Sequence, residues 1–201
     1  MSDATYVANT KIAKVVKSSE KGIKILDLAD MILFEEDQEQ KDALKRGKIV
    51  LNFTDKTSEE WSQYKHYLDV DLATLAFTDI LNGMFMPDPK EKKEYASLVE
   101  DFRGGRRTKN TPEGWEFESR YLSIDRTDKL TKMGPAISIS FRYSEGVEGD
   151  KGQVNPKPGG TSYRSSIMLS ISEARRLATT VLSYIQGKEI AYHVKKMMSQ
   201  S

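Results

Sequence analysis

A change of hydrophobic period lies within residues 163–187, which read YRSSIMLSISEARRLATTVLSYIQG. From Tyr163 to Ile171 apolar and polar residues alternate, and this period of two is typical of a strand with one buried face. After Ser172, the expected N-cap, apolar residues follow a helical spacing up to a predicted end near Gly187. The segment therefore predicts a strand that runs directly into an amphipathic helix.

The first half of the chain shows the same change of period. Residues 64–71 alternate as a strand does, and from Leu72 the apolar residues recur at helical intervals. Asp71 is the expected cap of this helix, and Gly83 followed by Pro87 is its expected end. A strand again runs into a helix.

The two junctions align with each other at one shift in the sequence. Leu68 falls on Leu169 at a shift of 101 residues (169 − 68 = 101). The strand predicted at 47–53 matches the strand predicted at 137–143 at a shift of 88 (137 − 49 = 88). Either the halves arose by duplication, or any two strand-to-helix junctions share these residues because capping and packing require them. The sequence leaves both explanations open.

The remaining segments of the first half are rich in aliphatic residues. Residues 11–17 and 22–34 predict the first strands. An alternative for residues 28–34 is the start of a short helix that continues into the charged stretch 35–46.

Three further sequence patterns lie between the two halves and in the second half. Residues 95–102 carry apolar side chains at i, i+3, i+4 and i+7, and predict a linker helix that Gly104 and Gly105 end. Residues 117–125 predict the first strand of the second half. Residues 144–162 are rich in glycine and proline, and predict a long flexible hairpin loop.

Together these patterns predict an α+β fold of two antiparallel strand-rich halves, each ending in a helix, in a duplicated ββββα-like layout with a helical linker. The expected boundaries are a first half at 1–86, a helical and basic linker at 87–114, and a second half at 115–201. A chain of 201 residues is also short enough for one compact domain.

Composition excludes several classes of protein. The chain has no cysteine, which excludes disulfides, thiol nucleophiles and thiolate metal sites, and its two histidines are too few for a three-histidine zinc site. No apolar run reaches the roughly 18–20 residues that cross a bilayer, and residues 1–11 lack the apolar region of a secretory signal. We therefore expect a cytoplasmic protein without membrane contact.

Catalysis is not expected. No phosphate-cradling glycine loop occurs, and His66, on the predicted core face, and His193 have no evident carboxylate and nucleophile partners. Asp69 and Asp71 share a face of the predicted strand, so a metal-dependent hydrolase is an alternative that would need further carboxylates beside them. We expect no catalytic residue, no cofactor and no metal.

Binding to single-stranded DNA is the function that the pattern favours. The net charge is only +1, but phosphates respond to local rather than total charge. Placing the aliphatic faces inward leaves aromatic, hydroxyl and guanidinium groups on the open faces, which is typical of single-strand binders. Such residues are also ordinary on the open face of an antiparallel sheet. The expected binding residues are Lys65, Tyr67, Arg106, Arg107, Phe117, Tyr121, Arg142 and Arg164.

Two further features have two interpretations each. Residues 103–109 carry four positive charges and two glycines. This segment is either a site that binds an anion or a solvated helix end. Trp61 and Trp115 lie in polar surroundings, as exposed stacking rings or as anchors over the edge of the core.

The layout of the paired junctions 68–81 and 169–182, with alternating strands before each, resembles the Whirly and Pur families of single-stranded nucleic-acid binders. The resemblance covers most of the chain but includes no diagnostic motif. It implies that the sheets bind the nucleic acid, with Tyr67, Tyr121 and the two arginines 142 and 164 facing it, and that helices hold protomers together in a homo-oligomer. Single-stranded DNA is the expected ligand, and RNA is the alternative, because no pocket for a 2′-hydroxyl is identifiable.

A protein of another class also fits the near-neutral charge. This alternative is a phage- or plasmid-type assembly or scaffold protein that acts through protein contacts of its helices and sheet edges. The two classes differ in where the basic residues lie, because a scaffold has no reason to collect arginines on one surface.

Overall fold

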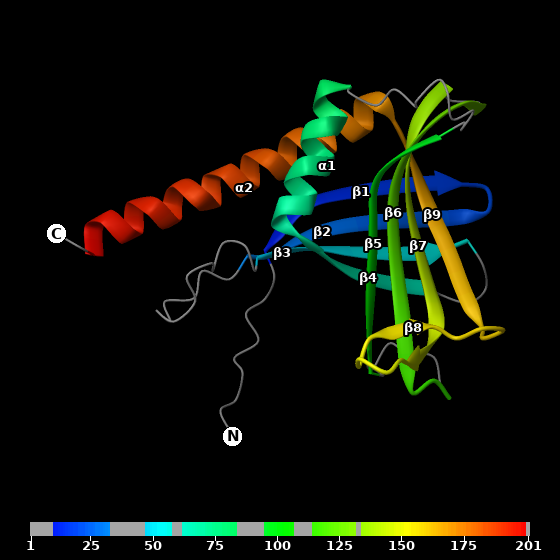
Figure 1. Ribbon diagram of the computed structural model, residues 1–201. Helices are drawn as coiled ribbons and strands as arrows, with labels where there is room; N and C mark the ends of the chain where they lie inside the picture. Colours follow the sequence, from blue (N-terminus) through cyan, green and yellow to red (C-terminus); the bar gives the residue numbers. More distant parts are fainter. Residues whose placement is uncertain are drawn as a thin grey trace.

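The computed structural model describes residues 10–32, 47–57, 62–83, 95–106, 114–131 and 134–199. These residues form nine strands in two antiparallel sheets, and two helices, which confirms the predicted α+β class. Figure 1 shows the strands of the first sheet crossing behind those of the second, with both helices on the same side of the molecule.

The first sheet has the strand order β1-β2-β3-β4. Its strands and the helix after them are β1 (Lys11–Ser19), β2 (Gly22–Met31), β3 (Lys48–Lys56), β4 (Ser62–Asp69) and α1 (Val70–Asn82). The predicted early strands are confirmed. The helical alternative for residues 28–34 is wrong as far as Met31, because Leu28 pairs with Leu51 of β3 and is fully buried. Residues 33–46 lie outside the described part of the chain.

Helix α1 begins two residues earlier than predicted. Val70 is its first residue and is buried, so Asp69 and not Asp71 stands at the N-cap position. Asp71 lies in the first turn, where a carboxylate interacts favourably with the helix dipole. Gly83 has φ 65° and ends the helix as predicted, because glycine adopts this left-handed conformation without strain.

The second sheet has the order β5-β6-β7-β8, and β9 also pairs with β7. Its strands are β5 (Tyr95–Arg106), β6 (Phe117–Thr131), β7 (Gly134–Glu148), β8 (Val154–Pro156) and β9 (Ser162–Ser170). The strands predicted at 117–125 and 137–143 are confirmed. The strand predicted to reach Ile171 ends one residue earlier.

The predicted linker helix is wrong, because residues 95–106 are a strand that pairs with β6. The register shifts between Ser97 and Val99, so Leu98 is the extra residue of a β-bulge. Leu98 and Val99 both pack against the core, and these two adjacent apolar residues produce the spacing that resembles a helix. Gly104, the expected helix end, lies inside the strand.

The predicted loop 144–162 is in part ordered into strands. β7 continues to Glu148, and β8 then pairs back onto it, with Gly146 opposite Pro156. Val154 packs directly on Gly104 and Gly146, because a Cβ atom at either glycine would come within 2.6 Å of it. The glycines therefore permit a close approach of the β7–β8 hairpin to the sheet.

Helix α2 (Ile171–Ser199) differs from the prediction at both ends. Ser170 and not Ser172 caps it: the Glu173 N–H donates to Ser170 Oγ at 3.3 Å, and the Ser170 N–H donates to the Glu173 carboxylate at 2.8 Å. The helix passes through Gly187 to Ser199, because a single glycine costs a helix only about 1 kcal/mol and good helix formers follow it.

One hydrophobic cluster joins both halves of the chain. It contains the inner faces of both sheets together with the buried sides of α1 and α2. At its centre the rings of Phe53 of β3 and Phe141 of β7 stack, with centroids 5.0 Å apart.

The two sheets share a pairing pattern. In β1 the extra residue of a bulge is Ile12, just as Leu98 is in β5. The residue after each bulge lies opposite a buried aliphatic residue of the next strand, Leu28 or Ile124. The last residues of β4 and β9, Asp69 and Ser170, are 101 positions apart (170 − 69 = 101), which is the shift read from the sequence.

Candidate nucleic-acid interface

Four large side chains form a row straight across the outer face of the second sheet. Phe102 of β5 lies opposite Tyr121 of β6, Tyr121 lies opposite Arg142 of β7, and Arg142 lies opposite Arg164 of β9. The Phe102 and Tyr121 rings are 4.4 Å apart between centroids, and the Arg142 guanidinium lies 4.9 Å from the Tyr121 ring centroid. We call these four residues the aromatic–arginine row.

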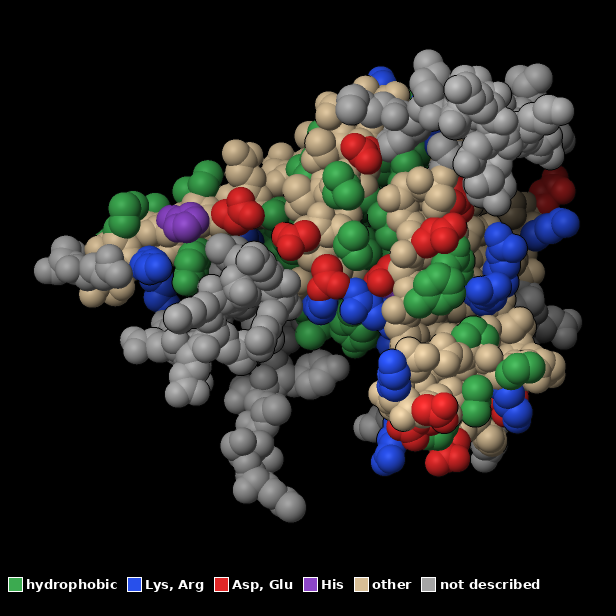
Figure 2. Space-filling view, viewed as in Figure 1, with side chains coloured by type: hydrophobic (Ala, Val, Ile, Leu, Met, Phe, Trp, Pro, Cys, Tyr) green, Lys and Arg blue, Asp and Glu red, His purple; other side chains and the backbone are tan. Residues whose placement is uncertain are grey.

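The row has both an exposed ring and an exposed cation. Phe102 is 56% exposed, and Arg164 is also exposed, whereas Tyr121 and Arg142 are half-buried against each other. Figure 2 shows hydrophobic and basic side chains side by side over this sheet. Stacking on Phe102 and charge contact at the arginines are therefore open to a ligand.

Serines flank the row on the same face. They occupy the aligned positions on either side of it, Ser123, Ser140 and Ser166 on one side and Ser119, Ser144 and Ser162 on the other. These side chains are short, but on the side of Ser119 the β7–β8 hairpin packs over the face, with Val154 on Gly104.

Arg142 and Arg164 differ from the arginines of the inner face in having no acidic partner. Within the described part of the chain neither forms an ion pair, whereas Arg103 pairs with Asp101 and Asp69, and Arg120 pairs with Glu118. The charges of the two row arginines are thus not neutralised by direct contact with a carboxylate.

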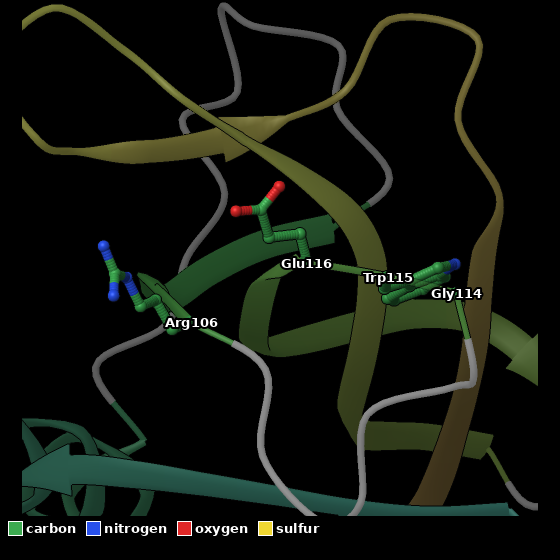
Figure 3. Close-up of a pocket in the computed structure, with 4 residues that line it drawn as sticks. All are labelled: Arg106, Gly114, Trp115 and Glu116. Atoms are coloured by element: carbon green, nitrogen blue, oxygen red, sulfur yellow. The ribbon is translucent and has the colours of Figure 1, made fainter.

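Two other predicted residues lie further along the same face. Arg106 is exposed and pairs in register with Phe117, near the end of the sheet. Arg106 also lines an open pocket of about 640 Å³ with Gly114, Trp115 and Glu116. Figure 3 shows that the three side chains of this pocket do not point toward a common centre. Arg107 lies outside the described residues.

Trp115 is an anchor and not an exposed stacking ring. It is 7% exposed, and its ring lies 5.9 Å from that of Tyr163 between centroids. Trp61 lies outside the described residues.

Lys65 and Tyr67 lie on the outer face of the first sheet, apart from the other predicted residues. The Lys65 ammonium is 5.1 Å from the Tyr67 ring centroid, and the Lys65 backbone bonds to the Tyr143 hydroxyl of the second sheet. The row of the first sheet that matches the aromatic–arginine row consists of Val16, Ile25, Thr54 and Gln63. The first sheet therefore has no equivalent of that row.

Sequence reasoning missed Phe102 because the surrounding residues were assigned to a helix. The signal that would have found it is the alternation of Glu100, Phe102 and Gly104 with the half-buried or buried residues between them, once Leu98 is taken as a bulge. This alternation assigns Phe102 to the outer face.

A buried network connects the sheets beneath the row. His66 Nε2 lies 2.9 Å from Asp101 Oδ2, which also accepts from Arg103 Nε at 2.9 Å. Arg103 and Lys48 both bond to Asp69. The core position predicted for His66 is confirmed, but the expectation that it lacks a carboxylate partner is wrong.

The imidazole of this network is shielded from solvent, whereas the Arg103, Lys48 and Asp69 side chains are partly exposed. His66 is 1% exposed and its Nδ1 has no hydrogen-bond partner among the described residues. Burial, the largest cause, lowers the pKa of His66, although Asp101 opposes this effect. The Asp101 carboxylate has a lowered pKa: burial raises it, but the hydrogen bonds from His66 and Arg103 outweigh this effect. A neutral imidazole that donates to a carboxylate is therefore the stable form.

Asp69 and Asp71 do not form the shared face that the sequence predicted, because Asp71 belongs to α1. No group of three or more metal-ligating side chains occurs among the described residues. Comparison of the chain with protein-family models, curated proteins and solved structures finds no match. Neither described helix combines the length and hydropathy needed to span a bilayer.

Proposed function

We propose that this protein binds single-stranded DNA, without catalysis and with little sequence preference, through the outer face of the second sheet. The observation that carries this proposal is the aromatic–arginine row, in which two rings and two arginines that form no ion pair with a described residue are aligned across four strands. Bases would stack on the exposed Phe102, and phosphates would contact Arg142 and Arg164.

We also infer that the two halves arose from one ββββα unit by duplication. The matching bulges at Ile12 and Leu98 support this, because a bulge is not required for a strand-to-helix junction. The layout predicted from the sequence resembles the Whirly and Pur families, and the proposal takes from this resemblance only the idea that a sheet binds the nucleic acid. Since the first sheet lacks the row, the proposal includes one binding face per chain.

Only some of the binding residues predicted from the sequence belong to the proposed binding face. Tyr121, Arg142 and Arg164 belong to the binding face, Arg106 and Phe117 extend it, and Phe102 joins it. Lys65 and Tyr67 are left out of the face because they lie on the other sheet.

Binding titrations of a variant without the two row arginines test the proposal. Fluorescence anisotropy with a labelled oligo-dT of about 20 nucleotides would compare the wild type with the double variant Arg142→Ala/Arg164→Ala. We expect a loss of at least tenfold in affinity at 50 mM salt and a salt slope smaller by about 1.4, since each phosphate contact on a single strand contributes about 0.7.

The matched control is Arg175→Ala/Arg176→Ala, which removes the same charge from exposed positions of α2. This control should bind nearly as the wild type does. Equal losses in the two double variants, or no binding by the wild type at 50 mM salt, would contradict the proposal. A parallel titration with oligo-U would show whether RNA binds as well as DNA.

Phe102 gives an independent test. Its replacement by alanine should weaken binding by about 1–3 kcal/mol, because one stacked base is lost. Its exposure predicts little change in thermal stability. Unchanged affinity in Phe102→Ala would remove stacking from the proposal.

A second candidate function, assembly through protein contacts, is favoured by the projecting half of α2. Figure 1 shows this half extending away from the body toward the C-terminus. Ile190, Val194, Met197 and Met198 are exposed there. At 3.6 residues per turn, the first three lie roughly opposite the stripe of Ala174, Val181 and Ile185 that packs in the core.

Light scattering after size-exclusion chromatography tests this second candidate. If the projecting stripe makes assembly contacts, Ile190→Ser/Val194→Ser should lower the mass of the assembled species without lowering the melting temperature. A wild type that stays monomeric at 100 µM would remove self-assembly as the role of this stripe.

A further inference from the structure

Two carboxylates border the aromatic–arginine row on the same outer face. Glu100 is exposed, lies two residues before Phe102 on β5, and pairs in register with Ser123 of β6. Asp125 lies four residues after Tyr121 on β6 and accepts from Ser123 Oγ at 2.8 Å. Glu100 is aligned with Ser123, and Asp125 is the next outward-facing residue of β6, so among the described residues this side of the row carries two carboxylates.

The other side of the row is bordered by the β7–β8 hairpin. Val154 stands on Gly104, which occupies the position two residues after Phe102 on the outer face. At β5, a ligand on the row would therefore contact the β7–β8 hairpin on the side of Gly104 and would lie next to a carboxylate on the side of Glu100.

We propose that Glu100 and Asp125 are specificity-determining residues that exclude duplex DNA from this face, and that a bound single strand follows the row across the β-strands. This inference rests on the proposed function. A lone strand can turn its bases to Phe102 and keep its phosphates at Arg142 and Arg164, away from the carboxylates. A duplex cannot do so, because its bases are paired inside and its second backbone must pass over the negative side.

The charge balance of the face supports this reading. Arg142 and Arg164 lie on β7 and β9, whereas Glu100 and Asp125 lie on β5 and β6. Attraction and repulsion of phosphate therefore come from different pairs of strands. They meet at Asp125, where burial, the largest cause, raises the pKa and the charge of Arg164 opposes this effect. Repulsion between like charges acts over several ångströms at low salt, within the screening length of about 10 Å at 0.1 M.

The test compares single-stranded and duplex forms of one labelled 16-nucleotide sequence, at 50 mM salt, with the full chain. The variant is Glu100→Gln/Asp125→Asn, which keeps the shape and hydrogen-bonding capacity of both side chains. We expect duplex affinity to rise by fivefold or more and single-strand affinity to rise by less than threefold, so that selectivity for the single strand falls.

The matched control is Asp150→Asn/Glu189→Gln, which changes the net charge equally at exposed positions in the β7–β8 turn and on α2. Its selectivity should equal that of the wild type. Glu100→Gln alone, at an exposed position, carries the test if the double variant melts at a lower temperature than the wild type.

The outcomes separate this inference from the proposed function. If the wild type binds the single strand and the two double variants change duplex affinity by the same factor, the role of Glu100 and Asp125 is overturned and the proposed function stands. If the wild type binds neither form, both are overturned.

Discussion

Phe53 and Phe141 stack in the centre of the core at an interplanar angle of 5° and occupy matching positions in the two sheets. Phe53 lies opposite Leu26, and Phe141 lies opposite Leu122. Each ring belongs to the strand that pairs with the last strand before a helix, β3 with β4 and β7 with β9. The two halves are therefore joined at equivalent residues, 88 positions apart (141 − 53 = 88), which is the shift found between the strands in the sequence.

This pair predicts strong coupling between distant parts of the chain. Phe53→Leu and Phe141→Leu should each destabilise the protein by about 1–2 kcal/mol, because each leaves a gap in a packed core. A double-mutant cycle should show a coupling of about 0.5–1.5 kcal/mol, the usual contribution of a stacked aromatic pair. Urea unfolding measures all four free energies.

Phe77 supplies the control for that cycle. It is fully buried in α1, and no ring contact joins it to Phe53 among the described residues. The losses of unfolding free energy in Phe53→Leu and Phe77→Leu should therefore add in the double variant. If the losses in Phe53→Leu and Phe141→Leu also add, the two halves are energetically separate.

The period of two predicts most of the fold because most of the long strands have one face against the core. Ile137, Ile139 and Phe141 alternate with polar residues and form the inner face of β7, as the sequence indicates. The pattern fails at β5, because the bulge at Leu98 breaks the alternation and two neighbouring apolar residues both face the core. Local periodicity cannot show a bulge, since its cause is the pairing with another strand.

The candidate site was predictable only in part for a similar reason. Alternation assigns Tyr121, Arg142 and Arg164 to outer faces, and the structure places them there. Their alignment in one row depends on the register of three strand pairs, which long-range contacts determine. Lys65 met the same sequence criterion and lies on the other sheet, as the two predicted halves imply, so it is not part of the row.

The capping box of α2 predicts a loss of stability in acid. The hydrogen bond from Lys17, the largest cause, lowers the pKa of Glu173 to about 2, and the Lys17 ammonium lies 2.5 Å from the carboxylate. A lowered pKa means that this stability is complete above the ordinary pKa near 4.5 and is lost as the pH falls toward 2. Glu173→Gln should cost about 1–2 kcal/mol at pH 7.

Urea unfolding at pH 7 and pH 2 measures this effect. The difference between the wild type and Glu173→Gln should shrink as Glu173 is protonated, because both side chains are then neutral. A difference that is equal at the two pH values would show that the charge of Glu173 does not contribute.

Gly104 predicts a steric requirement at the hairpin. A Cβ atom there would lie 2.6 Å from Val154 Cβ, whereas a Cβ atom at Gly105 would have no neighbour within 4 Å. Gly104→Ala should destabilise the protein by about 1–3 kcal/mol, and Gly105→Ala should be neutral or slightly stabilising. Thermal unfolding of the two variants distinguishes them, and equal melting temperatures would mean that β8 does not pack on β5 in solution.

The buried His66 predicts a second pH dependence, in a range separate from that of Glu173. Burial lowers the pKa of His66 below its ordinary value near 6.5, so the folded protein keeps the imidazole neutral while the unfolded chain takes up a proton. Stability should therefore fall as the pH decreases below about 6.5, by up to about 1.4 kcal/mol per pH unit. Replacement by a side chain that does not titrate should remove this slope.

His66→Gln tests this expectation because glutamine keeps a donor for Asp101. Unfolding free energies from urea titrations at pH 7.5, 6.5 and 5.5 should fall toward pH 5.5 in the wild type and stay level in the variant, which starts from a lower value at pH 7.5. His193→Gln, at an exposed position of α2, should keep the wild-type slope. If His66→Gln keeps the wild-type slope as well, the buried imidazole is not the group that titrates. Removing it would then leave the proton uptake on unfolding unchanged.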